Sequence, residues 1–167
     1  LTLYSKIDTN RIPYNFTTIS AKGYFGDCAE DLSVELESKG AEFTYRNFMD
    51  DDCKVIVDPE QLRRVINNIV SNSLKYTDKP KVEITMDVKD VGDFIQVEIE
   101  DNGKGIAAKD LPYIFDRFYR ADIARSAETG GFGIGLSIAR SIADGHRGTI
   151  RAESPDGRTI VFTAELK

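Results

Sequence analysis

The chain has 167 residues, and 41% of them are hydrophobic, which suits one domain with a substantial core. Its 22 basic and 28 acidic residues give a net charge of −6, which argues against a protein that binds nucleic acid or anionic membranes. No apolar run is long enough to span a membrane, no signal peptide is recognised, and Cys28 and Cys53 are not spaced as metal ligands. A longer parent protein can still carry both a signal and an anchor.

Hydrophobic periodicity and turn residues divide the chain into alternating helices and strands. Neighbouring strands of this kind favour antiparallel pairing with helices on one face, so we predict an α/β two-layer sandwich. The predicted elements, in chain order, are the end of a helix at Leu1–Ile7, a helix from about Ser20 to Lys39, strands at Glu42–Arg46 and Lys54–Val57, a helix that starts after Asp58, strands at Lys81–Lys89 and Phe94–Asp101, a helical piece near Lys109–Phe115, a helix at Leu136–Ala143, and strands at Thr149–Ser154 and Arg158–Leu166.

The helix after Asp58 has a clear start signal. Asp58 is a good N-cap, Pro59 suits the first helical position, and Gln61 stands where a capping box needs it. An apolar stripe runs along the helix from Leu62 to Val70.

The same helix also carries polar residues at positions that share one face, namely Asn68, Asn72, Lys75 and Tyr76. Asn is a poor helix former, so its presence indicates either a solvated face or a ligand site. An Asn carbonyl oxygen suits Mg²⁺, which takes its remaining ligands from water and substrate phosphates, and Lys75 would add a positive charge for those phosphates.

A carboxylate followed by two glycines ends the strand at Phe94–Asp101. Asp101 is expected to be buried at the strand end, where it can accept a hydrogen bond from an exocyclic amine such as that of adenine. Gly103 and Gly105 allow a tight turn and a close approach to a flat ligand. Asp-Asn-Gly is equally an ordinary turn sequence, so both interpretations stay open on this segment alone.

A second glycine-rich segment, Gly130-Gly-Phe-Gly-Ile-Gly-Leu136, leads directly into a predicted helix. Backbone N–H groups at a helix start form an anion site, whereas the simpler interpretation is a flexible loop. The spacing fits neither the dinucleotide fingerprint nor a Walker A loop. Residues 121–129 before it are small and polar, and they join Arg120 to the glycines as a mobile lid over a ligand would.

Four segments in this order resemble the asparagine box, first glycine box, phenylalanine box and second glycine box of sensor histidine kinases. The resemblance covers about Asp58 to Leu166 and implies the Bergerat ATP-binding fold, in which a mixed, mostly antiparallel sheet carries helices on one face. The segments are Asn68-Ile-Val-Ser-Asn-Ser-Leu-Lys-Tyr-Thr77, Asp101-Asn-Gly-Lys-Gly-Ile106, Phe115-Asp-Arg-Phe-Tyr-Arg120 and Gly131-Phe-Gly-Ile-Gly-Leu136.

The resemblance implies ATP and Mg²⁺ as ligands and gives each matching residue a role. Asp101 would bind the adenine amine, Asn72 would be the Mg²⁺ ligand, and Arg120 would reach the terminal phosphate. Asn68 stands where related hydrolases such as gyrase carry a glutamate that activates water, which fits a kinase. The other residues assigned to nucleotide binding are Lys75, Tyr76, Gly103, Gly105, Ile106, Gly131, Gly133, Gly135 and Leu136; the glycines of the second box would form the hinge and phosphate cradle of the lid.

The chain departs from the family pattern in two turns, His146-Arg147-Gly148 and Pro155-Asp-Gly-Arg-Thr159, neither of which is expected to touch nucleotide. His146 is the only histidine, and it lies where the family uses a histidine structurally, so we expect it to cap a helix rather than accept phosphate. We expect residues 1–12 to be the tail of an upstream dimerisation and phosphoacceptor helix, and residues 13–167 to be the catalytic ATP-binding domain.

The leading hypothesis is therefore the catalytic domain of a two-component sensor histidine kinase, which phosphorylates a histidine on a hairpin of the same protein. A response regulator would act downstream. The isolated domain is expected to be a cytoplasmic monomer, and the full-length protein a homodimer that can be anchored in the cell membrane. The alternative is a nucleotide-binding regulatory module, or an anti-sigma-type serine kinase, of the same fold.

Overall fold

The structure is a computed structural model that describes residues 12–75, 80–92, 94–103, 109–116, 132–153 and 159–164. The predicted helix at Leu1–Ile7 falls outside this described part, and the predicted boundary between residues 12 and 13 stays a prediction. Within it, no helix is long and apolar enough to cross a membrane.

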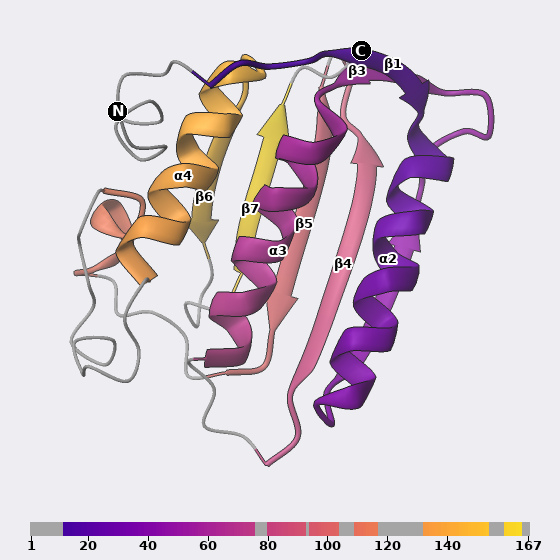
Figure 1. Cartoon of the computed structure of the whole chain (residues 1–167). Helices are drawn as coiled ribbons and strands as arrows, with labels where there is room; N and C mark the ends of the chain where they lie inside the picture. Colours follow the sequence, from indigo (N-terminus) through magenta and orange to yellow (C-terminus); the bar gives the residue numbers. More distant parts are fainter. Residues whose placement is uncertain are drawn as a thin grey trace.

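A five-stranded sheet forms the back layer of the molecule (Figure 1). Its first two strands pair in parallel and all the others pair antiparallel, so the predicted mixed, mostly antiparallel sheet is confirmed. A separate two-stranded antiparallel sheet joins β1 (Thr17–Ser20) to β3 (Lys54–Val57). In spatial order the large sheet consists of β2 (Glu42–Asn47), β4 (Glu83–Asp90), β5 (Ile95–Asp101), β7 (Thr159–Ala164) and β6 (Thr149–Glu153).

In the part of the chain that the structure describes, three helices cover one face of this sheet, which confirms the predicted two-layer arrangement (Figure 1). They are α2 (Ala21–Ser38), α3 (Pro59–Lys75) and α4 (Phe132–Gly145). A single 3₁₀ turn, η1 (Leu111–Tyr113), replaces the longer helical piece that the sequence predicted, and Pro112 lies within it.

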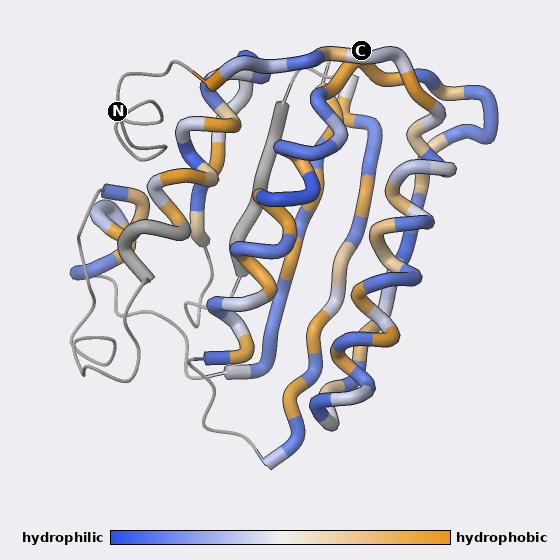
Figure 2. Tube along the Cα trace, viewed as in Figure 1, coloured by the Kyte–Doolittle hydropathy of each residue, from blue (hydrophilic) through white to orange (hydrophobic). Residues whose placement is uncertain are grey.

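The core lies between the two layers, as the periodicity of the elements requires. On β5, Ile95, Val97 and Ile99 are buried, whereas the residues between them are only half-buried. On α3 the predicted stripe from Leu62 to Val70 is buried. Figure 2 shows the corresponding alternation of hydrophobic and hydrophilic stretches along the helices. At about 0.8 kcal/mol per buried CH₂, this layer is the main source of stability.

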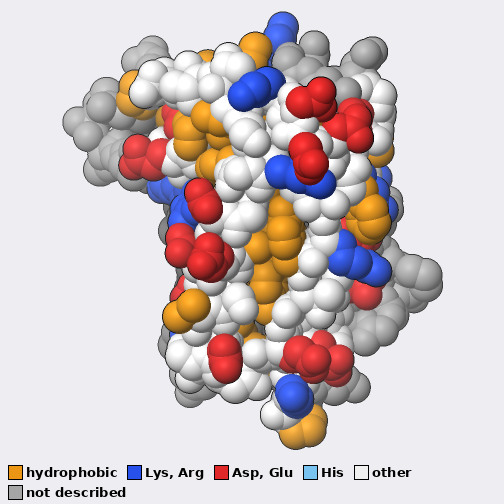
Figure 3. Space-filling model, turned by 90° about the vertical axis from the view of Figure 1, so that its right-hand side faces the viewer, with side chains coloured by type: hydrophobic (Ala, Val, Ile, Leu, Met, Phe, Trp, Pro, Cys, Tyr) orange, Lys and Arg blue, Asp and Glu red, His pale blue; other side chains and the backbone are white. Residues whose placement is uncertain are grey.

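The edge strand β2 is fixed by polar contacts at its end and by an ion pair with β4. Arg46 forms a two-bonded ion pair with the buried Asp87 of β4, with both N–O distances at 2.8 Å. The half-buried β2 residues Phe43 and Tyr45 pack against the core. Apolar surface remains on this side of the molecule, which Figure 3 shows as a hydrophobic band between charged residues.

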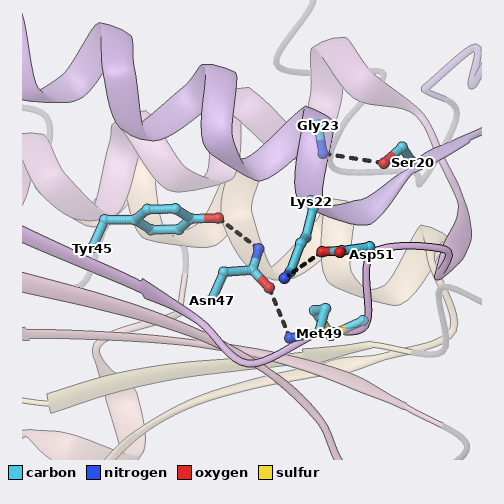
Figure 4. A network of polar contacts seen from close by, with 7 residues as sticks. All are labelled: Ser20, Lys22, Gly23, Tyr45, Asn47, Met49 and Asp51. Atoms are coloured by element: carbon cyan, nitrogen blue, oxygen red, sulfur yellow. Dashed lines mark hydrogen bonds and ion pairs between the residues drawn. The ribbon is translucent and has the colours of Figure 1, made fainter.

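The turn between β2 and β3 is attached to the start of α2 (Figure 4). The side-chain amide of Asn47 donates to the Tyr45 hydroxyl at 2.6 Å and accepts from the Met49 N–H at 2.8 Å. The side chain of Asp51 is 93% exposed and pairs with Lys22 at 2.7 Å. Ser20 caps α2 by accepting from the Gly23 N–H at 3.2 Å.

Two further features differ from the sequence-based expectation. Strand β1 was not predicted, because its four residues form a strand only through pairing with the remote β3. Helix α4 begins at Phe132 rather than Leu136, so Gly133 and Gly135 lie inside its first turns instead of in a preceding loop. A glycine costs a helix about 1 kcal/mol relative to alanine, which favourable packing can outweigh.

The segment before β1 packs on the end of α4. The Tyr14 hydroxyl donates to the Ser141 carbonyl at 3.1 Å, and a Cβ added at Gly145 would lie 2.1 Å from that hydroxyl oxygen. A side chain at this glycine would therefore displace the Tyr14 ring.

We predict that Gly145→Ala lowers the free energy of unfolding by about 1–3 kcal/mol, because the ring must move and its hydrogen bond is lost. The matched control is Gly26→Ala in α2, where an added Cβ meets nothing within 4 Å. This change should be neutral or should stabilise the protein by up to about 1 kcal/mol. Urea denaturation of both variants measures the difference, and equal stabilities would contradict the Tyr14 contact.

Candidate functional site

Asp101 is the last residue of β5 and lies on the face of the sheet that carries the helices, because it pairs with Ile84, whose side chain is buried under them. Its carboxylate accepts from the Gly103 N–H at 2.7 Å, which forms a tight turn. The sequence predicted a buried carboxylate, but Asp101 is half-buried because the strand ends there. Gly103 is buried, so the backbone approaches the core closely at this turn.

Asn102 holds the turn in place, a role that the sequence analysis missed. Its side-chain oxygen accepts from the Glu83 N–H at 2.9 Å, and its side-chain nitrogen donates to the Lys81 carbonyl at 3.0 Å. Its own N–H donates to the Glu83 carbonyl at 3.2 Å. These bonds attach the turn to the start of β4, so the direction of the Asp101 side chain is fixed from the adjacent strand.

The predicted N-cap of α3 is present. The Asp58 carboxylate accepts from the Gln61 N–H at 3.2 Å and, with its other oxygen, from the Asn15 N–H at 2.8 Å. In a capping box, the side chain of the third residue after the cap accepts from the N–H of the cap residue. Here the Asp58 N–H donates instead to Nε2 of His146 at 3.1 Å. The side-chain oxygen of Gln61 is buried and has no hydrogen-bond partner among the described residues.

His146 is buried at the end of α4, as expected of a structural histidine. Its Nδ1 lies 2.9 Å from the Ile142 carbonyl, which can only accept, so Nδ1 carries the proton. Nε2 is then the acceptor for Asp58, and the imidazole is neutral. Burial lowers the pKa of His146 below its ordinary value of 6.5, and the bond to Ile142 and the Asp58 charge oppose this shift only partly.

The polar residues predicted on one face of α3 differ in how far they are exposed to solvent. Asn72 is 7% exposed and follows the buried Ile69 by three residues, which places it on the core side of the helix. Asn68, one turn earlier, is half-buried, and Lys75, the last residue of α3, is exposed. A buried Asn on the core side of α3 cannot be explained by a solvated face, which was the simpler of the two interpretations.

These groups meet at one end of the domain. In Figure 1, α3 and β5 both run downward to their ends, α4 begins at its own lower end beside them, and α3 packs against both α4 and β5. The structure therefore brings Asp101, the end of α3 with Asn72 and Lys75, and the first turns of α4 to a common end. Leu136 is fully buried there in α4.

Five of the predicted site residues lie outside the described residues, namely Tyr76, Gly105, Ile106, Arg120 and Gly131. The predicted lid at residues 121–129 does so as well. Phe115 is described and is buried beside the fully buried Ile114, so it anchors its segment to the core. Among the described residues, no group of three His, Cys, Asp or Glu could hold a metal ion by itself.

The sequence is similar to several known proteins. The profile of a family described as histidine kinase-, DNA gyrase B-, and HSP90-like ATPase matches residues 57–167. Sensor histidine kinase WalK of Bacillus subtilis (strain 168) is 40% identical over 166 residues, which are 98% of this chain and 27% of that protein. Sensor histidine kinase CusS of Escherichia coli (strain K12) is 39% identical over 143 residues, which are 86% of this chain and 27% of that protein. This chain thus spans about a quarter of the length of these relatives.

The fold is similar to that of solved structures. The nucleotide-free catalytic domain of histidine kinase ThkA has a TM-score of 0.75 at 23% identity, over 90% of this chain and 95% of that one. Full-length ShkA in complex with AMPPNP has a TM-score of 0.76 at 21% identity, over 98% of this chain and 34% of that one. At these identities the match establishes a shared fold.

The neutral, buried His146 makes stability depend on pH. Because its pKa in the folded protein lies below the ordinary 6.5, the unfolded chain takes up the proton first as the pH falls. The contribution of the neutral His146 to the free energy of unfolding is complete above about pH 6.5 and is lost progressively as the pH falls below that value. We predict that the stability advantage of the native protein over His146→Gln, measured by urea denaturation, shrinks from about pH 8 to about pH 5. A constant difference over this range would contradict a buried neutral imidazole.

Proposed function

Because this chain belongs to the family of histidine kinase-, DNA gyrase B-, and HSP90-like ATPases, we propose that it is the catalytic domain of a sensor histidine kinase. On this proposal it holds ATP and passes the terminal phosphoryl group to a histidine of the parent protein. The observation that carries the proposal is the meeting of Asp101, Asn72 and the start of α4 at one end of the domain. The high identity to WalK over nearly the whole chain supports a kinase rather than another ATPase.

Asp101 is proposed to recognise adenine. A carboxylate offers about four acceptor positions, so the bond to Gly103 leaves capacity to accept from the adenine amine. Asn102 supports this role, because its four hydrogen bonds with residues 81–83 keep the turn in one conformation before nucleotide binds. Gly103, Gly105 and Ile106 would line the base beside it.

Asn72 is proposed to provide the protein oxygen for Mg²⁺. Its amide is buried on α3, and the absence of a described carboxylate or histidine cluster means that an ion here would take its other ligands from the nucleotide phosphates and water. Asn68 and Lys75 would lie along the phosphates. Lys75, exposed at the end of α3, can supply a point charge to them.

The remaining assignments rest on the family resemblance. Tyr76 would line the nucleotide, and Arg120 would contact the terminal phosphate. Gly131, Gly133 and Gly135 would supply the hinge of the lid and the phosphate cradle, with Leu136 at its base. The amino end of α4 supports the cradle, because free N–H groups at a helix start favour phosphate.

The transfer step itself needs an acceptor from outside this domain. An imidazole nitrogen of that acceptor would form a bond to the γ-phosphorus while the bond to the bridging oxygen breaks and ADP leaves. His146 cannot be this acceptor in the folded domain, because its two nitrogens are engaged with Ile142 and Asp58 and its ring is buried. Asn68 in place of a glutamate would leave the domain without a base to activate water.

The partners follow from this scheme. The acceptor would lie on a hairpin of the parent protein, whose tail we propose at residues 1–12, ahead of the catalytic domain at 13–167. A dimeric, membrane-anchored parent in which this domain is cytoplasmic, and a downstream response regulator, complete the proposal.

Phosphotransfer to a separate hairpin tests the proposal. The chain alone, incubated with ATP labelled at the γ-phosphate, should bind nucleotide without labelling itself. Addition of the parent protein's histidine hairpin should give a phosphate on the hairpin that is labile to acid and stable to base. Phosphate on the isolated chain that is lost in His146→Ala, or base-labile phosphate on a serine of the added protein, would contradict the proposal; the second result would favour a serine kinase of the same fold.

We predict that Asp101→Asn weakens ATP and ADP binding by at least about tenfold. The Asn oxygen can keep the bond to Gly103, but its NH₂ group would face the adenine amine, and an unpaired buried donor costs about 1–3 kcal/mol. The control is Glu100→Ala, because Glu100 is exposed and points to the opposite face of the strand. Calorimetry on both folded variants measures their affinities for ATP and ADP. Unchanged affinity in Asp101→Asn would show that Asp101 does not bind adenine.

We predict that Asn72→Ala abolishes most of the gain in ATP affinity that Mg²⁺ provides, about tenfold or more, whereas Asn72→Asp, which keeps an oxygen ligand, retains it. Asn67→Ala is the matched control, because Asn67 is exposed on the same helix. Titrations with Mg²⁺ and with a chelator measure the gain for each variant. An equal gain in Asn72→Ala and Asn67→Ala would reduce Asn72 to a packing residue of α3.

A further inference from the structure

A cavity of about 500 Å³ lies beside the outer side of α4, away from the residues assigned to nucleotide. It is open to solvent, and η1, α4 and the edge strand β6 form its walls. The lining residues are Leu111, Pro112, Phe115, Arg140, Asp144, Thr149, Ile150, Arg151 and Ala152. None of these residues belongs to the proposed adenine, magnesium or phosphate sites, so the cavity calls for a separate explanation.

The cavity follows the edge of β6 rather than one face of the sheet. Four consecutive residues of this strand, 149–152, line it, although successive side chains of a strand point to opposite faces. A cavity that runs along the strand edge touches all four. In the described part of the chain, β6 is the last strand of the sheet and pairs only with β7. An outer strand edge presents backbone N–H and C=O groups that can pair with another extended chain.

The side chains around this edge favour an acidic ligand that also carries apolar groups. The cavity lining contains two arginines, Arg140 and Arg151, and one carboxylate, Asp144, in a protein whose overall charge is −6. Arg140 is 55% exposed and has a long contact of 3.4 Å with the exposed Asp116, a pairing that contributes little and can be exchanged for a ligand carboxylate. Phe115 and Ile150 supply apolar surface beside these charges.

We propose that this cavity is a peptide-docking groove in which an acidic, extended segment of a partner protein adds to β6 as a further strand. Its backbone pairs with the strand edge, which gives affinity irrespective of sequence. An apolar side chain enters between Phe115 and Ile150, and a neighbouring carboxylate lies between Arg140 and Arg151.

Short capped peptides that alternate Asp or Glu with Val, Leu or Phe are the probe, and the same pool with Lys in place of each acid is its counterpart. Amide spectra of the isotope-labelled chain report binding residue by residue. The acidic pool should shift the amides of 149–153 and of Arg140 and Asp144, whereas the basic pool should leave them unchanged. No saturable shift with the acidic pool, or equal shifts with both pools, would overturn the proposal.

The two arginines and the strand edge can be tested separately. Arg140→Ala and Arg151→Ala should each weaken peptide binding about threefold, whereas Lys54→Ala, which removes an exposed lysine from the distant β3, should not change it.

Strand addition is tested with two peptides that are methylated on alternate backbone nitrogens, one at the odd positions and the other at the even positions. Only one of the two carries its methyl groups on the edge that pairs with β6, and this peptide should lose binding. If both methylated peptides bind as tightly as the parent, or if glutarate alone binds as tightly, strand addition is wrong. Concentration-dependent dimerisation through β6 without peptide would assign the groove to a second copy of this chain instead.

Discussion

The hydrogen bond from the Asp58 N–H to His146 Nε2 connects the parts of the domain on which the site depends. Asp58 starts α3 and His146 follows the last residue of α4, so this one bond fixes the start of one helix against the end of the other. The Ile142 carbonyl holds the imidazole in the tautomer that the bond needs. Tyr14 and Phe16 pack on the same ring, with centroid distances of 5.6 Å and 5.1 Å, and thereby attach the segment before β1.

The opposite ends of these two helices carry the candidate site. Because α3 and α4 are packed together and fixed at one end, their directions determine where Asn72 and the first turn of α4 lie relative to the end of β5. Asn102 supports the end of β5 in the same way, because it ties the turn after this strand to β4. The domain thus places the polar groups of the candidate site on rigid elements, which would reduce the ordering that ligand binding requires.

Most of the fold could be predicted from the sequence, because its signals are local. The helix predicted from about Ser20 to Lys39 is observed at Ala21–Ser38, and the alternation of Ile95, Val97 and Ile99 correctly predicts the buried face of β5. The family resemblance predicted a site at the end of this strand and on α3. The fold that it implied is confirmed, whereas the roles of individual residues stay predictions.

The missed features depend on partners that are remote in sequence. Asp58 meets Asn15 across 43 positions and His146 across 88, and no periodicity within one helix reports such contacts. Asn102 looked like a simple turn residue because its partners belong to another strand. The start of α4 was placed too late because glycine propensity was given more weight than packing.

The central claim is that nucleotide binds where β5 ends, α3 ends and α4 begins. Titration of the isotope-labelled chain with a non-hydrolysable ATP analogue and Mg²⁺, followed through its amide spectrum, tests this most directly. The account predicts the largest shifts at 101–103, at 68–75 and at the first turns of α4, with β1 and β3 unaffected. Saturable binding whose shifts cluster at β1 and β3, or along β6, would contradict it.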